Sequence, residues 1–137
     1  MFRSRLLKRL RSPLVGERIA ATYELDYKHF LDENIRNAVR ENLNSNDDDL
    51  VEISVMRILI RGRDVPSVHK VRAILNETNN NLVFNVSVSS LECLAENCPE
   101  TAPYTLREFE RLAAANVPAE FKERLEKGIR EIQRIFV

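Results

Sequence analysis

Glycine and proline are scarce in this chain, with three glycines and five prolines among 137 residues. An all-β fold of many short strands needs both residues at its turns, and its strands need alternating runs of β-branched residues. These signals are rare here, whereas the content of alanine, glutamate, arginine and leucine suits helices. The composition therefore predicts an all-α protein.

An excess of either charge is also missing, because 21 lysines and arginines balance 21 aspartates and glutamates. The net charge of zero argues neither for nor against a nucleic-acid partner. No run of about 18 apolar residues occurs, so we expect no membrane span. The N-terminal segment lacks the apolar stretch of a secretory signal, although its arginine-rich, acid-free character leaves a transit peptide as an alternative. We expect a cytoplasmic protein.

Candidate metal ligands are few. A disulfide between Cys93 and Cys98 would join the middle of a predicted helix to its end, and a metal site would need further cysteine or histidine nearby. The aspartates at 47–49 lack the glycine and distal glutamate of a calcium loop. We therefore predict reduced thiols and no cofactor, and we expect Asp48 or Asp49 to cap a helix that begins at Leu50.

Helical periodicity alternates with short polar breaks along the whole chain. Residues 50–63 are apolar on nearly all sides and rich in β-branched residues, so a strand is the alternative there; their length and the neighbouring helices favour a helix. Thr105 and Glu108 have the spacing of a capping box. The expected helices span residues 2–11, 14–25, 28–43, 50–63, 66–76, 82–96, 103–115 and 119–136. In the third of them, the expected inward stripe is Phe30, Leu31, Ile35, Ala38, Val39 and Leu43. Burial should peak at Leu43, Val55, Ile58, Leu59, Leu75, Leu91 and Leu125.

An internal repeat organises these helices. The dipeptide Leu-Val begins three segments with spacings of 36 and 32 residues, and small residues at Ala21, Ser54 and Ser87 would let the second helices of successive hairpins approach closely. One hairpin cannot bury its apolar face alone, whereas a stack of four forms one continuous core. The pattern predicts a single domain, residues 1–137, of four antiparallel helical hairpins; an ordinary helical bundle is the alternative. The repeats span approximately residues 2–25, 28–63, 66–97 and 103–136.

The repeat resembles the HEAT family, whose paired helices have about this period. In that family, Asp or Asn precedes the second helix, and an aliphatic residue is followed by a run of small residues. Residues 17–25 (ERIAATYEL) are most similar to the family's second helix. The family has a basic residue after the aliphatic position, whereas this chain has Glu52 there in the second repeat and Phe84 in the third. Armadillo-like stacking is a closely related alternative. The resemblance implies a right-handed α-solenoid whose second helices line the concave face.

The resemblance implies a non-catalytic scaffold or protein–protein interaction module that binds a macromolecular partner, another protein, on this concave face. The expected partner-binding residues are Met56, Arg57, Ile60, Arg61, Asn85, Ser89, Glu92 and Glu96. The alternative is a nucleic-acid-associated protein that uses the basic N-terminal helix, which could equally be the polar outside of a capping helix. The possible polyanion contacts are Arg3, Arg5, Lys8, Arg9 and Arg11.

HEAT-like folds also include DNA glycosylases and bilin lyases, so a subunit of such an enzyme is a further alternative. The glycosylases use aromatic residues and an acid in the concave groove, but this chain has no tryptophan and its three tyrosines are scattered. His29 and His69 lie 40 residues apart, and no glycine-rich phosphate loop is present. We therefore do not expect an enzyme.

Overall fold

The computed structural model describes residues 2–136, with side chains from Ser4 onward. Helical residues make up 82% of this part, which contains no strand. The eight α-helices are α1 (Phe2–Leu10), α2 (Val15–Tyr23), α3 (Glu33–Asn42), α4 (Asp48–Met56), α5 (Val68–Glu77), α6 (Asn81–Asn97), α7 (Ala102–Ala114) and α8 (Ala119–Gln133). Short 3-10 segments are η1 (Tyr27–Leu31), η3 (Val65–Ser67), η4 (Pro99–Thr101) and η5 (Arg134–Phe136), and a π turn, η2 (Arg57–Arg61), extends α4. The prediction of an all-α fold is confirmed, and the strand alternative for residues 50–63 is wrong.

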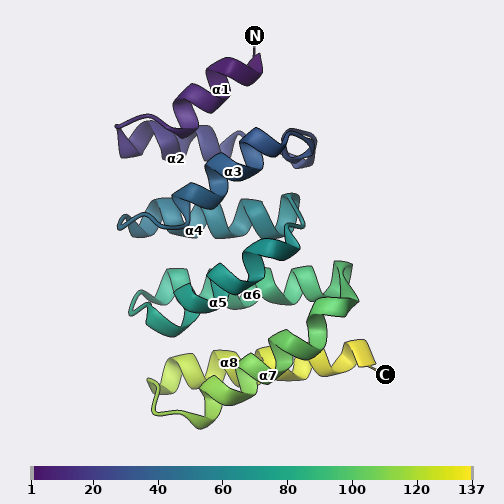
Figure 1. The fold of residues 1–137 in the computed structure, drawn as a ribbon. Coiled ribbons are helices and arrows are strands. Elements are labelled where there is room, and N and C mark those ends of the chain that lie inside the picture. Colours follow the sequence, from purple (N-terminus) through teal and green to yellow (C-terminus); the bar gives the residue numbers. More distant parts are fainter. Residues whose placement is uncertain (1, 137) are drawn as a thin grey trace.

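The helices alternate between two layers (Figure 1). The odd-numbered helices form one layer, and each contacts the even-numbered helix that follows it along the chain. Within the second layer, α2 contacts α4, α4 contacts α6, and α6 contacts α8. The chain therefore progresses from one end of a stack to the other, and its two ends lie far apart (Figure 1).

One core of buried apolar side chains runs through the stack, from Leu6 in α1 to Ile132 in α8. The residues predicted to be most buried are each at most 2% exposed, namely Leu43, Val55, Ile58, Leu59, Leu75, Leu91 and Leu125. Ala21, Ser54 and Ser87 are fully buried, one on each of the neighbouring helices α2, α4 and α6. The three small side chains are therefore inside the protein, and α4 contacts both α2 and α6.

The single helix predicted over residues 28–43 is wrong, because the chain forms η1 and then α3. Asp32 separates the two elements: its backbone is extended, and its carboxylate accepts a hydrogen bond from the Asn34 amide at 2.9 Å. An N-cap of this kind begins a new helix in a new register. Leu31, predicted to face inward, therefore lies before the helix and is 83% exposed.

The capping predictions also need correction. Asp47, not Asp48 or Asp49, is the N-cap of α4, because its carboxylate accepts a hydrogen bond from the Leu50 amide at 3.0 Å. The next two aspartates occupy the first helical turn, where a negative charge is favourable. The predicted capping box at Thr105 is wrong, because α7 already begins at Ala102 and the threonine is buried within the helix.

A buried carboxylate fastens the turn after η2. Asp64 is 2% exposed and accepts hydrogen bonds from Arg36 at 2.8 Å, from Arg40 at 2.6 and 2.9 Å, and from the Ser67 hydroxyl. Burial alone would raise the pKa of Asp64, but the hydrogen bonds from Arg40, Ser67 and Arg36 outweigh it and hold the pKa below its ordinary value. We call these four residues the Asp64 clasp. It joins α3 to the start of the third hairpin.

Gly62 is required where the π turn ends. A Cβ atom at this position would lie 2.7 Å from the Ile58 carbonyl oxygen and 2.9 Å from the Phe30 ring. Both atoms belong to well-packed elements that cannot move aside cheaply. The absence of a side chain therefore lets the chain turn tightly toward the Asp64 clasp.

Candidate functional site

The predicted partner-binding residues lie on two neighbouring helices of the even-numbered layer. Four of them, Met56, Arg57, Ile60 and Arg61, are at the end of α4 and in η2, and the other four are on α6. Helix α6 contacts both α4 and η2. The structure therefore brings the two groups onto one side of the stack, which we call the even face: the outward side of α2, α4, α6 and α8.

Three of these eight residues are engaged within the chain. Arg57 donates a hydrogen bond to the Tyr23 carbonyl oxygen at 3.2 Å, and its guanidinium lies 5.8 Å from the centroid of the Tyr23 ring. Arg124 of α8 donates to both Glu92 oxygens at 2.9 and 3.2 Å and to the Ser89 hydroxyl at 2.9 Å. These bonds hold α4 against α2 and α8 against α6, so they stabilise the even-numbered layer.

The remaining five residues form the available part of the even face. Arg61, Asn85 and Glu96 are exposed, and their side chains have no hydrogen-bond or ion-pair partner in the described chain. Met56 and Ile60 are half-buried. The five residues therefore combine two apolar side chains, one amide and one charge of each sign.

Polar contacts between residues 32 positions apart connect successive hairpins. An asparagine side chain takes part in three of them, and the Arg124–Glu92 ion pair is the fourth. The asparagine contacts are Asn42 with the Leu10 carbonyl oxygen at 3.1 Å, Asn76 with Glu108 at 2.8 Å, and Asn80 with Asp48 at 3.2 Å. Sequence reasoning missed this ladder because it sought the basic residue of the HEAT pattern. The separation of 32 residues that these four pairs share was the signal that could have found it.

A hollow of about 190 Å³ lies between α2 and α4 on the even face, and we call it the α2–α4 groove. Its lining residues are Ile19, Tyr23, Asp49, Glu52, Ile53 and Met56. In the described chain, the carboxylates of Asp49 and Glu52 have no hydrogen-bond or ion-pair partner. The sequence did not indicate this groove, since its walls come from two different repeats.

The predicted polyanion contacts on α1 divide into two groups. Arg9 is paired with Glu24, and Arg11 donates two hydrogen bonds of 3.2 Å to Glu41. Arg5 and Lys8 are exposed and have no such partner, and the Arg3 side chain lies outside the described part.

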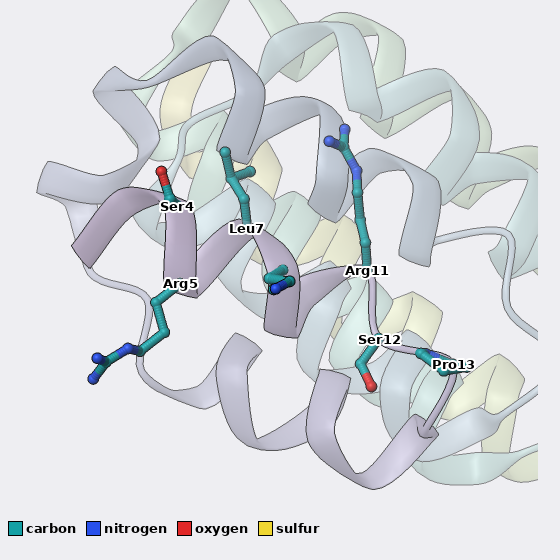
Figure 2. A pocket seen from close by; sticks show the side chains of 7 residues that line it. Ser4, Arg5, Leu7, Arg11, Ser12 and Pro13 are labelled. Atoms are coloured by element: carbon teal, nitrogen blue, oxygen red, sulfur yellow. The ribbon is translucent and has the colours of Figure 1, made fainter. Parts of the chain in front are cut away.

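An open hollow of about 830 Å³ accompanies α1, lined by Ser4, Arg5, Leu7, Lys8, Arg11, Ser12 and Pro13. Figure 2 shows Arg5 and Arg11 extending in different directions from the helix. Their charges do not converge on one point, which a built phosphate site would require. The helix offers a diffuse positive field instead.

The other candidates for chemistry have structural partners. The Nδ1 atom of His29 accepts a hydrogen bond from the Asp26 amide at 2.8 Å and so completes the cap of η1. His69 lies on α5, where its Nδ1 atom is 3.4 Å from Nη2 of Arg72. Cys93 and Cys98 are free thiols. Within residues 2–136, no three His, Cys, Asp or Glu side chains gather in a way that could hold a metal ion. No helix of the described part has the length and apolar character needed to cross a membrane.

Comparisons with protein-family models, with curated proteins and with solved structures found no match. The function therefore has to be argued from the chain's own geometry.

Proposed function

We propose that this chain is a HEAT-like α-solenoid that acts as a non-catalytic protein-binding module. The repeated contacts of α2 with α4, α4 with α6 and α6 with α8 support a stack of equivalent hairpins. Four polar pairs that join residues 32 positions apart support it as well, because neighbouring repeats place equivalent positions side by side. A stack of this kind presents an extended surface without needing a pocket.

The observation that carries the proposal is the composition of the even face. Arg61, Asn85 and Glu96 are exposed and have no partner in the described chain, and Met56 and Ile60 of the same face are half-buried. Methionine and arginine are enriched in the centres of protein–protein interfaces, and mixed charge is typical of their rims. A polyanion would instead favour a continuous positive surface. The even face therefore fits a protein partner better than a nucleic acid.

The test is affinity capture from the native host with the full chain, followed by mass spectrometry. The diagnostic variant exchanges charges on the even face, Arg61→Glu with Glu96→Lys, which leaves the net charge unchanged. Its matched control is Arg107→Glu with Glu110→Lys on the exposed side of α7. We expect a specific partner to be lost only with the even-face exchange, while both variants keep the wild-type melting temperature. Loss with the control exchange alone would place the interface on the other layer and contradict the proposal.

A nucleic-acid-associated protein is the second candidate, and the unpaired Arg5 and Lys8 on α1 favour it. Arg9 and Arg11 weaken this candidate because they already neutralise Glu24 and Glu41. Binding of duplex DNA or RNA should therefore be weak and vanish by about 0.2 M salt. Sub-micromolar binding at physiological salt, abolished by neutralising the five basic residues of the N-terminal segment and unaffected by the even-face exchange, would reverse our choice.

The free thiols of Cys93 and Cys98 support a cytoplasmic location, because such cysteines persist in a reducing compartment. A disulfide-permitting compartment would expose both to oxidation.

A further inference from the structure

We propose that the α2–α4 groove receives one arginine or lysine side chain of the protein partner. This inference rests on the proposed function and names the chemistry of one contact within it. It departs from the predicted partner surface, because five of the six groove residues were not among the residues expected to bind.

The size of the groove fits one long side chain. Its volume of about 190 Å³ is many times the space that one water molecule needs. Sites for cofactors and drug-sized ligands are larger, about 300–1,000 Å³. A side chain that enters from a partner surface needs no larger space.

The lining of the groove matches an aliphatic chain that ends in a cation. Ile19, Ile53 and Met56 supply an apolar floor, against which the methylene stem of a lysine or arginine can pack. Tyr23, whose side chain is 60% exposed, supplies an aromatic ring at the edge. The same ring already has the Arg57 guanidinium 5.8 Å from its centroid, which shows that a cation is accommodated beside it.

The two carboxylates of the groove, Asp49 and Glu52, have no hydrogen-bond or ion-pair partner in the described chain. Asp49 and Glu52 lie three residues apart on α4, so they share one face of the helix, where like charges are mutually destabilising. Asp49 lies in the first turn of α4, where the helix dipole stabilises a negative charge, so its presence has a structural reason. Glu52 lies beyond the first turn, is half-buried and has no partner. The half-buried carboxylates of Glu92 and Glu131 are each paired with an arginine, so a cation from outside would give Glu52 the same kind of partner.

A metal ion does not fit the same site. Two carboxylates provide too few oxygen ligands for calcium or magnesium, and the groove contains no histidine or cysteine. The apolar floor also offers no group that could hold the ion's remaining water molecules. A lysine or arginine side chain fits better, because its apolar stem can pack on the apolar floor while its cation lies beside the carboxylates and the Tyr23 ring.

The experiment uses the full chain labelled with carbon-13 in its methionine methyl groups. The chain has two methionines, and Met56 lies in the groove, so its signal reports on occupancy directly. The probe is N-acetyl-Leu-Arg-Leu-amide, and its matched control carries citrulline, which has nearly the same shape and no charge. We expect the arginine peptide to shift the Met56 signal in a saturable way. Citrulline, or the variant Glu52→Gln, should weaken binding about fivefold, the upper range for an exposed ion pair.

The control variant is Glu110→Gln, which removes the same charge from the exposed side of α7, outside the even face, and should leave the affinity unchanged. Equal binding of the citrulline peptide, or equal weakening by the control variant, would overturn the inference. A Met56 shift that depends on protein concentration without peptide, and disappears with Arg5→Gln and Lys8→Gln, would assign the groove to a second copy of this chain and overturn it too.

The outcome is separable from that of the proposed function. If Met56 does not respond while partner capture still depends on Arg61 and Glu96, the inference fails and the binding module stands. If Met56 responds and no partner depends on the even face, the preference of the groove for a basic side chain stands and the proposed function fails.

Discussion

Replacing Asp64 by asparagine should remove the charge of the Asp64 clasp while keeping its shape. The wild-type carboxylate accepts hydrogen bonds from two arginines and one serine at a position that is 2% exposed. Breaking a buried ion pair by removing one charge costs about 3–5 kcal/mol. Arg36 and Arg40 are 22% and 30% exposed, so both guanidinium groups can recover part of their hydration. We therefore expect Asp64→Asn to lower the free energy of unfolding by about 2–4 kcal/mol near neutral pH.

The pH dependence of this loss follows from the lowered pKa of Asp64. In the folded chain the carboxyl binds its proton less readily than in the unfolded chain, whose pKa is near the ordinary value of 3.8. The stabilising contribution is therefore fully present above that value and is lost as the pH falls through the folded pKa. The difference between wild type and variant should shrink below about pH 3.8 and stay constant above it.

The assay is urea unfolding followed by circular dichroism across this pH range. Glu33→Gln is the matched control, because Glu33 also receives a hydrogen bond from Arg40 but its side chain is 68% exposed. An exposed ion pair contributes little, so the control should lose less than about 1 kcal/mol. A loss below about 1 kcal/mol for Asp64→Asn, or a loss of the same size at every pH, would refute the argument that a buried charge holds this turn.

Three further substitutions test the core, the helix crossings and the cap. Leu59→Ala should cost about 2–5 kcal/mol in urea unfolding, because this leucine is fully buried between the layers; a loss under about 1 kcal/mol would show that its helix is not central. Ser54→Ala should raise the free energy of unfolding by about 1 kcal/mol, because the buried hydroxyl has no hydrogen-bond partner within residues 2–136, and a clear loss would mean that the hydroxyl is bonded. Asp47→Ala should cost about 1 kcal/mol while Asp48→Ala costs less, and the reverse order in thermal melts would restore the original assignment of the cap.

The order and type of the elements followed from the sequence because apolar spacing is a local signal that the core then uses directly. Leu43, Leu75 and Leu91 are buried for the reason that predicted them, since each lies on the apolar stripe of its helix. The predictions of helix boundaries failed where a single polar side chain determines the backbone conformation. Asp32 begins a new helix within a continuous apolar pattern, and no periodicity rule separates that aspartate from one on a solvated helix face.

For the candidate site, too, some features could be predicted from the sequence and others could not. The predicted repeat was enough to place Met56, Arg61 and Glu96 on neighbouring elements of one layer, and the structure shows that α6 contacts both α4 and η2. Deciding which of the eight expected residues are available needed side-chain contacts. Arg124 lies 32 residues after Glu92 and 35 after Ser89, and its engagement of both became visible only when α8 was placed against α6.

The α2–α4 groove shows most clearly why a repeat pattern underdetermines function. Tyr23 ends one second helix and Glu52 lies early in the next, so a comparison of equivalent repeat positions never pairs them. Stacking brings them to the same hollow, because a residue near the end of α2 faces α4 across the helix crossing. In our proposal, the repeat sets the surface, and the residues that break its equivalence set what the surface recognises. Glu52, which has no partner in the described chain and lines the same hollow as the Tyr23 ring, is such a break, and in our proposal it gives the groove a preference for a basic side chain.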